Sequence, residues 1–193
     1  MVGNDAPKDK SGDTAQRLLD AAADEFNAHG FAGTDTNRIA RRAGFAPQTF
    51  YRWFEDKTEI FIRVYHAWQM QEAGTLNALL RENAPDAQLV RAAIDHHRAF
   101  LKFRRSLNFL TQENPKVRAA RAESRARQIQ VIRMIQGDRA QSESEIVPLL
   151  FQMERLADVL AEGEISDMGL DPASTEAALA GIIGRLREGA RPA

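Results

Sequence analysis

Residues 36–54, which read TNRIARRAGFAPQTFYRWF, predict two short helices joined by a tight turn. In the first helix, Ile39 and Ala43 fall at helical spacing on an apolar stripe. Gly44 follows, and glycine tolerates the left-handed conformation that often ends a helix. Pro47 then stands at the first position of the second helix, where its missing amide hydrogen costs nothing. Two helices joined in this way form a helix-turn-helix, whose second helix enters the major groove of DNA.

The second helix of the pair presents one apolar and one polar face. Phe50 and Phe54, four residues apart, would bury the apolar face. On the polar face, Gln48 suits an adenine edge and Arg52 a guanine edge, because each can make two hydrogen bonds to that base. We expect Thr36 to cap the first helix through its hydroxyl. The expected DNA-binding residues, base-reading and backbone-contacting together, are Thr36, Pro47, Gln48, Thr49, Tyr51, Arg52, Trp53 and Lys57.

Several members of this set have a structural alternative. Lys57 begins the following helix, where the helix dipole disfavours a cation, so an external anion such as a DNA phosphate would suit it. Tyr51 could donate to a phosphate or only pack on the bundle, and Trp53 could stack on the sugar-phosphate backbone or pack. The two threonines could be caps or surface hydroxyls. One of the two base-reading residues could contact phosphate instead.

The flanking segments complete a small helical domain. Asp13 and Gln16 can form a capping box that opens a helix ending near Gly30. Asp56 or Thr58 can cap a further helix that leaves the helix-turn-helix. A bundle this small would be marginal alone, so we expect its stability to depend on the rest of the chain.

Residues 17–65 resemble the N-terminal domain of tetracycline-repressor (TetR) family regulators, over about a quarter of the chain. The residues that carry the resemblance are Gly30-Phe31, Thr34 or Thr36 before Ile39-Ala40, Ala43-Gly44, Thr49-Phe50-Tyr51, Phe54 and Lys57. The resemblance implies an all-α fold, in which a three-helix DNA-binding domain precedes a helical domain for ligand binding and dimerisation. The chain departs from the commoner pattern at Ala46-Pro47-Gln48, where many members carry Ser-Lys or a similar pair. The base-reading residues of that pattern therefore do not transfer.

The rest of the chain predicts helices and no convincing strand. The expected helices cover about 58–82, 86–103, 107–112, 115–136, 142–162 and 172–189, with a loop over 163–171. Asp86 is the expected cap of the second of these. The expected domains are a disordered tail over 1–12, a helix-turn-helix domain over 13–57 and a helical effector-binding and dimerisation domain over 58–193.

The net charge of −1 and the isoelectric point of about 6.4 would not by themselves suggest a nucleic-acid binder. The distribution of charge is more informative. Between residues 31 and 57, five basic residues oppose three acidic ones, whereas from 142 to 193 ten acidic residues oppose four arginines. These net charges of +2 and −6 are compatible with a protein that touches DNA at one end only.

Missing motifs argue against an enzyme built on a helical bundle. The chain has no cysteine, which excludes disulfides, thiol catalysis and cysteine-type zinc sites. It also has no glycine-rich phosphate loop, His-Glu zinc motif or paired Glu-x-x-His set. We therefore expect no catalytic residue, no cofactor and no metal. No apolar run approaches about eighteen residues and no signal-peptide core opens the chain, so we expect a soluble, cytoplasmic protein without a membrane partner.

The last two long helices are the predicted site of self-association. Gly181 and Gly184 lie inside the final helix, where glycine is unfavourable unless another helix approaches closely. One recognition helix reads few base pairs, so proteins of this kind commonly bind palindromic sites as symmetric dimers. The predicted interface residues are Leu149, Met153, Leu160, Leu179, Ile182, Ile183, Gly184 and Leu186. The alternative is ordinary helix packing within a monomer.

The middle helices hold the candidate effector site. The resemblance implies an apolar cavity after the DNA-binding domain, and its candidate lining residues are Trp68, His97, Phe100, Phe103, Phe109, Met134 and Phe151. The alternative is that most of these residues form plain core. From residue 98 to 127, nine basic residues oppose two acidic ones. This basic segment could be a solvated face, could capture an anionic effector, or could pair with the acidic C-terminal helices.

We therefore expect a homodimeric transcription regulator, a repressor that binds a palindromic operator in double-stranded DNA and is released by a small-molecule effector. The alternative is a DNA-binding or adaptor protein without a small-molecule sensor, whose C-terminal region only dimerises or recruits a partner. A large apolar cavity among the middle helices would favour the first, and a fully packed core the second.

Overall fold

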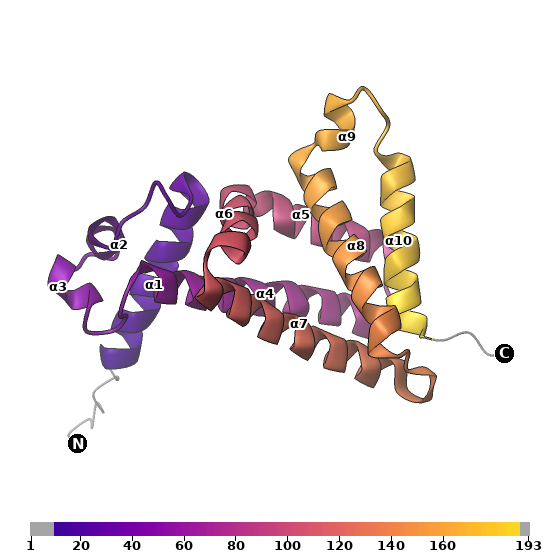
Figure 1. Ribbon diagram of the computed structural model, residues 1–193, viewed down its shortest axis with the longest axis horizontal. Helices are drawn as coiled ribbons and strands as arrows, with labels where there is room; N and C mark the ends of the chain where they lie inside the picture. Colours follow the sequence, from indigo (N-terminus) through magenta and orange to yellow (C-terminus); the bar gives the residue numbers. More distant parts are fainter. Residues whose placement is uncertain (1–9, 190–193) are drawn as a thin grey trace, which may run out of the picture.

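The computed structural model describes residues 10–189. All regular structure in that range is helical, which confirms the predicted all-α fold. The elements are α1 (Lys10–His29), α2 (Thr36–Arg42), α3 (Pro47–Phe50), α4 (Lys57–Arg81), α5 (Asp86–Ala99), α6 (Leu101–Glu113), α7 (Pro115–Gln136), the 3₁₀ helix η1 (Gly137–Arg139), α8 (Glu143–Glu162), α9 (Glu164–Asp167) and α10 (Ala173–Glu188) (Figure 1). Among these, no helix is both long and apolar enough to span a bilayer.

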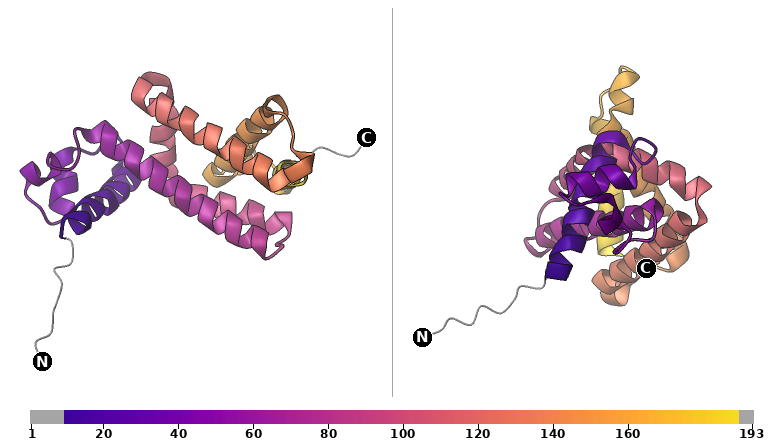
Figure 2. Two further views of the ribbon diagram at one scale, coloured as in Figure 1. Left: turned by 90° about the horizontal axis from the view of Figure 1, so that it is seen from below. Right: turned by 90° about the vertical axis from the view of Figure 1, so that its left-hand side faces the viewer.

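The helices form two lobes joined by α4 and α6. Figure 1 shows α1, α2 and α3 at one end and α8 and α10 at the other. Helix α4 leaves the first lobe and runs into the second, with α7 in contact beside it (Figure 2). The main hydrophobic core crosses the boundary, because it joins Phe26 and Phe50 of the first lobe to Phe61 of α4 and Phe103 of α6. The first lobe therefore depends on the second for its core, as the sequence predicts.

The start of α1 differs from the prediction. Residues 1–9 of the tail predicted over 1–12 lie outside the described residues, and residues 10–12 already belong to α1. The predicted capping box of Asp13 and Gln16 is therefore wrong, since both residues lie inside the helix. The Gln16 amide instead donates to Asp20 Oδ1, one turn further on, at 2.8 Å.

Most later boundaries agree with the prediction, but the helix expected over 86–103 is broken. The break lies at Phe100, with φ −126° and ψ 32°. The Asn27 side chain of α1 donates to the Ala99 carbonyl at 2.6 Å, so the last carbonyl of α5 is hydrogen-bonded to the first lobe. Asp86 is the first residue of α5 rather than its cap, which is Pro85. A single turn, α9, also interrupts the loop expected over 163–171.

The C-terminal helices bury their apolar stripes inside this chain. Two cores hold α8 and α10 against α5 and α7. The predicted interface residues Leu149, Leu160, Leu179, Ile182, Gly184 and Leu186 are all buried there, and Met153 and Ile183 are half-buried. A Cβ on Gly184 would lie 3.0 Å from Asp86 Oδ2, so the close approach that this glycine permits is to α5 of the same chain. Packing within the chain therefore takes up most of the surface of these residues, and a dimer interface formed by them stays a prediction.

Candidate DNA-binding site

The turn between α2 and α3 has the geometry that the sequence predicts. Gly44 has φ +79°, the left-handed conformation that favours glycine. The Phe45 amide donates back to the Ala40 carbonyl at 2.9 Å, and Pro47 stands at the start of α3. The cap of α2 is Asp35 rather than the predicted Thr36, because the Asp35 carboxylate accepts from the Arg38 amide at 2.8 Å. Thr36 is the first residue of the helix.

Helix α3 is one turn long, and residues 51–53 continue it as turns. Phe50 is fully buried and Phe54 is 7% exposed, so the predicted apolar face is confirmed. The opposite face is polar: Gln48, Tyr51, Arg52 and Trp53 are exposed, while Pro47 and Thr49 are half-buried. Helix α3 lies at the outer end of the first lobe (Figure 1), and the exposed side chains of this face are therefore open to a partner.

Two predicted DNA-contacting hydroxyls bond to one another. Thr36 Oγ1 and Tyr51 Oη lie 3.0 Å apart, joining the start of α2 to the end of α3. One hydroxyl hydrogen is used in this bond and the other remains, so the pair can still donate to an external acceptor. The structural and the phosphate-contacting roles are thus compatible for both residues.

Lys57 holds the segment between α1 and α2. Its Nζ donates to the carbonyls of Phe31 and Thr34, both at 2.8 Å, and lies 4.1 Å from the centre of the Phe31 ring. Burial lowers the pKa of Lys57, and the nearby Asp35 carboxylate opposes that shift. Two of the three ammonium hydrogens are therefore engaged within the lobe. A phosphate contact through the third stays a prediction.

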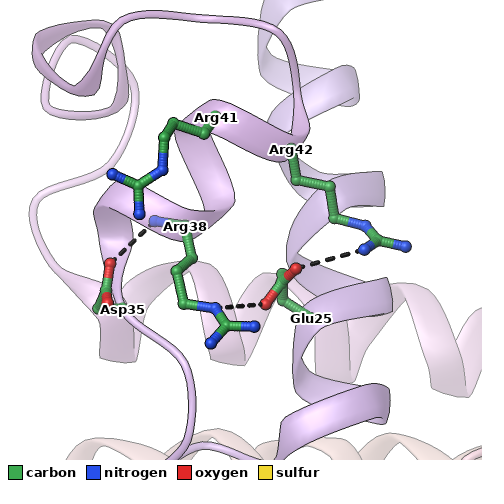
Figure 3. Close-up of a pocket in the computed structure, with 5 residues that line it drawn as sticks. All are labelled: Glu25, Asp35, Arg38, Arg41 and Arg42. Carbon is green, nitrogen blue, oxygen red and sulfur yellow. Dashed lines mark hydrogen bonds and ion pairs between the residues drawn. The ribbon is translucent and has the colours of Figure 1, made fainter.

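A buried carboxylate fixes α2 to α1. Glu25 is 5% exposed and accepts from Arg38 Nε at 3.0 Å and from Arg42 Nη1 at 3.3 Å. Arg42 also bonds to Asp24, and this hydrogen bond raises the pKa of Arg42. Glu25, Asp35 and the three arginines of α2 line a surface pocket, in which the Arg41 side chain projects away from Glu25 (Figure 3). The sequence analysis did not predict these ion pairs. The signal for them is an acidic residue, Glu25, on the apolar stripe of α1, together with two arginines four residues apart, Arg38 and Arg42, on α2.

Part of the predicted effector-site set is brought together: the Trp68 ring packs against His97 and Phe103, and Phe100 joins them through His96. Trp68, His97 and Phe103 are buried, and Phe100 is half-buried. By contrast, Phe109, Met134 and Phe151 are 64%, 73% and 48% exposed. These three do not line a shared internal cavity with the others, so that part of the prediction is wrong. The Phe151 ring instead lies 4.1 Å beneath the guanidinium of Arg125.

The basic segment pairs with an acidic face of α8. Glu154, Asp158 and Glu162 recur every four residues and therefore lie on one side of that helix. Arginines from α6 and α7 meet them in ion pairs that join Arg104 to Asp158, Arg105 to Glu162, and Arg121 and Arg125 to Glu154. Of the three roles left open for this segment, pairing with the acidic C-terminal helices is the one observed for these arginines.

His97 lies at the centre of this network. Its Nδ1 is 2.8 Å from Asp158 Oδ1 and its Nε2 is 3.1 Å from Glu72 Oε1. Both contacts are hydrogen bonds only when both ring nitrogens carry hydrogen, so the geometry fits the charged imidazolium. Burial acts to lower the pKa of His97, but the bonds to Asp158 and Glu72 outweigh it and raise the pKa. His97 is thus a satisfied core residue.

Helix α6 connects this network to the DNA-binding lobe. The Phe31 amide donates to Ser106 Oγ at 2.9 Å, and Lys102 Nζ donates to the Ala28 carbonyl at 2.7 Å. Arg104 lies between Lys102 and Ser106 in the sequence of α6, but its side chain bonds to Asp158 of the second lobe. A displacement of Arg104 would therefore act on the same helix that positions α1.

Comparisons with known proteins agree with this geometry. Residues 18–64 match the family described as bacterial regulatory proteins, tetR family. The chain is 34% identical over 76 residues to the uncharacterized HTH-type transcriptional regulator YdgC of Bacillus subtilis, a match that spans 39% of each protein. A candidate TetR-family transcriptional regulator from Mesorhizobium loti has the same fold, with a TM-score of 0.67 and 20% identity over 93% of this chain and 97% of the other.

A third relative was solved with a ligand. The transcriptional regulator FadR from Bacillus subtilis, in complex with stearoyl-CoA, has a TM-score of 0.53 and 17% identity over 91% of this chain and 99% of the other. At this identity the likeness shows the fold alone. The family match over residues 18–64 is supported by the geometry of α2 and α3, so this part of the chain is a DNA-binding domain of the kind found in the tetR family of bacterial regulatory proteins.

Proposed function

We propose that this chain is a DNA-binding transcription regulator that acts in the cytoplasm, where it represses by binding a palindromic operator as a homodimer and is released by a small-molecule effector. The observation that carries the proposal is the polar face of residues 48–53. It is exposed, it follows a helix-turn-helix turn, and it is backed by the buried rings of Phe50 and Phe54. A rigid polar face of this kind suits the edges of bases in the major groove.

The DNA-contacting side chains would fall into two classes. Gln48 and Arg52 would read base edges, because both are exposed on α3 and the turns after it. The Thr36–Tyr51 hydroxyl pair and Thr49 would contact phosphates, which fix the position of the protein without reading sequence. Lys57 would support the site chiefly by holding the loop before α2.

The homodimer would use the outward side of α8 and α10 rather than the buried residues predicted above. Phe151 of α8 is 48% exposed, and the small residues Ala177, Ala178 and Gly181 of α10 are exposed. A Cβ on Gly181 would meet no atom within 4 Å, so no helix of the same chain needs this glycine. A second copy packed here would bury these residues and fix the separation of the two DNA-binding lobes.

A charge placed on that surface tests the dimer. Gly181→Glu would bury an unpaired carboxylate in the interface and should convert a dimer into a folded monomer. Ala126→Glu, on an exposed position of α7, is the matched control and should leave the dimer intact. Light scattering at micromolar concentration measures both. A wild type that is monomeric, or a Gly181→Glu protein that is still dimeric, would remove the interface from this surface.

An effector is proposed on two grounds. The related fold of the Bacillus subtilis FadR carries stearoyl-CoA. In this chain, α6 links the buried ion pairs of the second lobe to α1 through Ser106 and Lys102. A molecule that displaces α6 would therefore change the placement of α2 and α3, and with it the affinity for DNA.

A regulator without a small-molecule sensor is the second candidate. It is favoured by the ion pairs that join α8 to α6 and α7, and by the exposure of Phe109 and Met134, which leaves fewer apolar side chains to line a cavity. It differs from the first candidate in one observable: no compound that binds the second lobe would change DNA affinity.

The DNA-binding proposal is tested by removing one base-reading charge. Arg52→Ala should weaken operator binding and relax the preference at one base pair by about 1–3 kcal/mol. Arg91→Ala removes an exposed arginine from α5 in the second lobe and should leave affinity unchanged. Fluorescence anisotropy with operator variants measures both. Equal effects of the two substitutions would contradict the assignment of Arg52.

A further inference from the structure

The interior of the second lobe contains a hydrogen-bond donor that has no partner. Trp68 is 4% exposed, and its indole Nε1 is buried without a hydrogen bond in the structure. An indole N–H can only donate, so only an acceptor can satisfy it. Buried polar groups almost always have a partner, and each exception calls for an explanation. The position of Trp68 thus predicts an acceptor that the chain itself does not supply.

The groups around Trp68 are positively charged or aromatic. The Arg104 guanidinium carbon lies 4.8 Å from the centre of the Trp68 ring, and His97 lies at 5.4 Å, centre to centre. His96 is stacked on the indole at 4.7 Å, and the Phe103 ring lies 6.3 Å away. An acceptor that enters beside this indole would therefore lie near two cationic side chains, Arg104 and His97, and the aromatic ring of Phe103.

With His97 charged, as its two contacts with carboxylates require, this network of buried and half-buried side chains carries one more positive than negative charge. Its cations are Arg104, Arg121, Arg125 and the doubly protonated His97, and its anions are Glu72, Glu154 and Asp158. His96 does not add to the excess, because burial lowers its pKa and favours the neutral ring. An unbalanced charge in a protein interior is costly, so an added anion would be favoured there.

We infer that the effector carries an anionic head group, a carboxylate or a phosphate on an apolar body, that accepts from Trp68 Nε1 and competes with Asp158 for Arg104. This inference rests on the proposed function, since it specifies the chemical class of the effector proposed there. Phe100 and Phe103, beside His96 and Trp68, would pack against the apolar body.

The same contact explains how the signal would travel. Asp158 on α8 accepts from Arg104, His97 and Asn108, which belong to α6 and α5. An anion that takes Arg104 from Asp158 would loosen α6 from α8. Because α6 also bonds to the segment between α1 and α2, DNA and the anion would oppose one another, each weakening the binding of the other by the same factor.

The probes for the test are three ten-carbon compounds that differ in the head group: decanoate, decyl phosphate and the neutral decanamide. Calorimetry with the full chain should show binding of at least one of the two anions, and the amide should bind about tenfold more weakly or not at all. The anion that binds identifies the head group as carboxylate or phosphate. Binding of the amide as tightly as the better anion, or no binding of any probe, would overturn the inference.

Two tryptophan variants locate the site. Trp68→Phe keeps a ring in the core but removes the donor, and should weaken anion binding about tenfold, as expected for one lost hydrogen bond to a charged group. Trp53→Phe removes the other tryptophan from the exposed DNA-binding face and should leave anion affinity unchanged. In that variant Trp68 is the sole fluorophore, so its emission should change on anion binding. Unchanged emission, or unchanged affinity in a folded Trp68→Phe protein, would place the anion elsewhere and overturn the inference.

DNA release is measured separately from binding. An anion that binds at Trp68 but leaves the protein on DNA would contradict the proposed effector response and leave the anion site intact. A neutral compound that binds the second lobe and releases DNA would support the proposed function and contradict the anionic class. Failure of the effector response and failure of the anionic class therefore give different results in these two measurements.

Discussion

Arg104 of α6 donates three hydrogen bonds of 2.8 to 3.0 Å to the carboxylate of Asp158 on α8, although the two side chains are only 4% and 8% exposed. Asp158 also accepts from His97 and from the Asn108 amide. Burial acts to raise the pKa of Asp158, but these donors hold it well below its ordinary value. This carboxylate joins three helices of the second lobe, and one of them, α6, contacts the DNA-binding lobe.

Loss of that carboxylate should be severe. Asp158→Ala leaves Arg104 and His97 buried without their shared anion, and breaking a buried pair in this way costs about 3–5 kcal/mol. Urea unfolding followed by circular dichroism measures the loss. Glu164→Ala, which removes an exposed pair with Arg155, is the control and should cost under about 1 kcal/mol. Similar losses for both variants would contradict the central position given to Asp158.

The contribution of His97 to stability should depend on pH. Its folded pKa is raised, so its stabilisation is complete below its unfolded value of about 6.5 and is lost as pH rises through the folded value. The difference in unfolding free energy between wild type and His97→Gln should therefore be larger at pH 6 than at pH 9. Equal differences at the two pH values would show that His97 is not charged in the folded protein.

His66→Gln provides the opposite case. Burial lowers the pKa of His66, so protonation opposes folding and the wild type loses stability relative to this variant as pH falls below about 6.5. The two histidine substitutions should thus give pH dependences of opposite sign. Other titrating groups contribute the same pH dependence to the unfolding free energy of all three proteins. Their contribution therefore cancels when each variant is compared with the wild type.

The turn of the helix-turn-helix should not tolerate a side chain at Gly44. Its φ of +79° costs roughly 1–2 kcal/mol for alanine, and the new Cβ would lie 3.1 Å from Arg17 Nη2. Gly44→Ala should lower stability by about that amount and weaken DNA binding by displacing α3. Gly74→Ala, inside α4 with no atom within 4 Å of the new Cβ, should instead raise stability by roughly 0.5–1 kcal/mol. A neutral Gly44→Ala in thermal unfolding would contradict the turn geometry.

Tyr51→Phe should separate the hydroxyl from the ring. The variant loses the 3.0 Å bond to Thr36 and any donation to a phosphate, so operator affinity should fall by about 1 kcal/mol. Because no charge is removed, the dependence of affinity on salt should stay the same. Lys57→Ala is a useful comparison, since loss of a cation whose third ammonium hydrogen reaches a phosphate should lower the salt slope by about one. A changed slope for Tyr51→Phe would point to a shift of the whole recognition face.

The sequence predicted features that local chemistry decides. Gly44 and Pro47 bound the turn whatever the rest of the chain does, and Phe50 and Phe54 set the buried face of α3. The cap of α2 was misplaced by one residue, because Asp35 and Thr36 are both good caps and only the backbone conformation distinguishes them.

The features that the sequence did not predict depend on distant contacts. The end of α5 is held by Asn27, 72 residues away from Ala99. The apolar stripe that includes Leu179 and Ile182 is real, but a stripe does not reveal whether its partner is the same chain or a second copy. Phe109 was predicted to line a cavity because it is aromatic, but its side chain is exposed. Residue type alone therefore does not show whether an aromatic ring is buried.

Sequence-specific operator binding is tested by selecting duplexes from a random DNA pool with the wild-type protein and with a Gln48→Ala, Arg52→Ala double variant. We expect the wild type to enrich an inverted repeat whose half-sites lie about one helical turn, or a multiple of it, apart. The double variant should lose the preference at particular positions of each half-site while retaining weak, salt-sensitive binding. Selection of no common sequence by the wild type, or of the same sequence with the same preference by both proteins, would contradict this expectation.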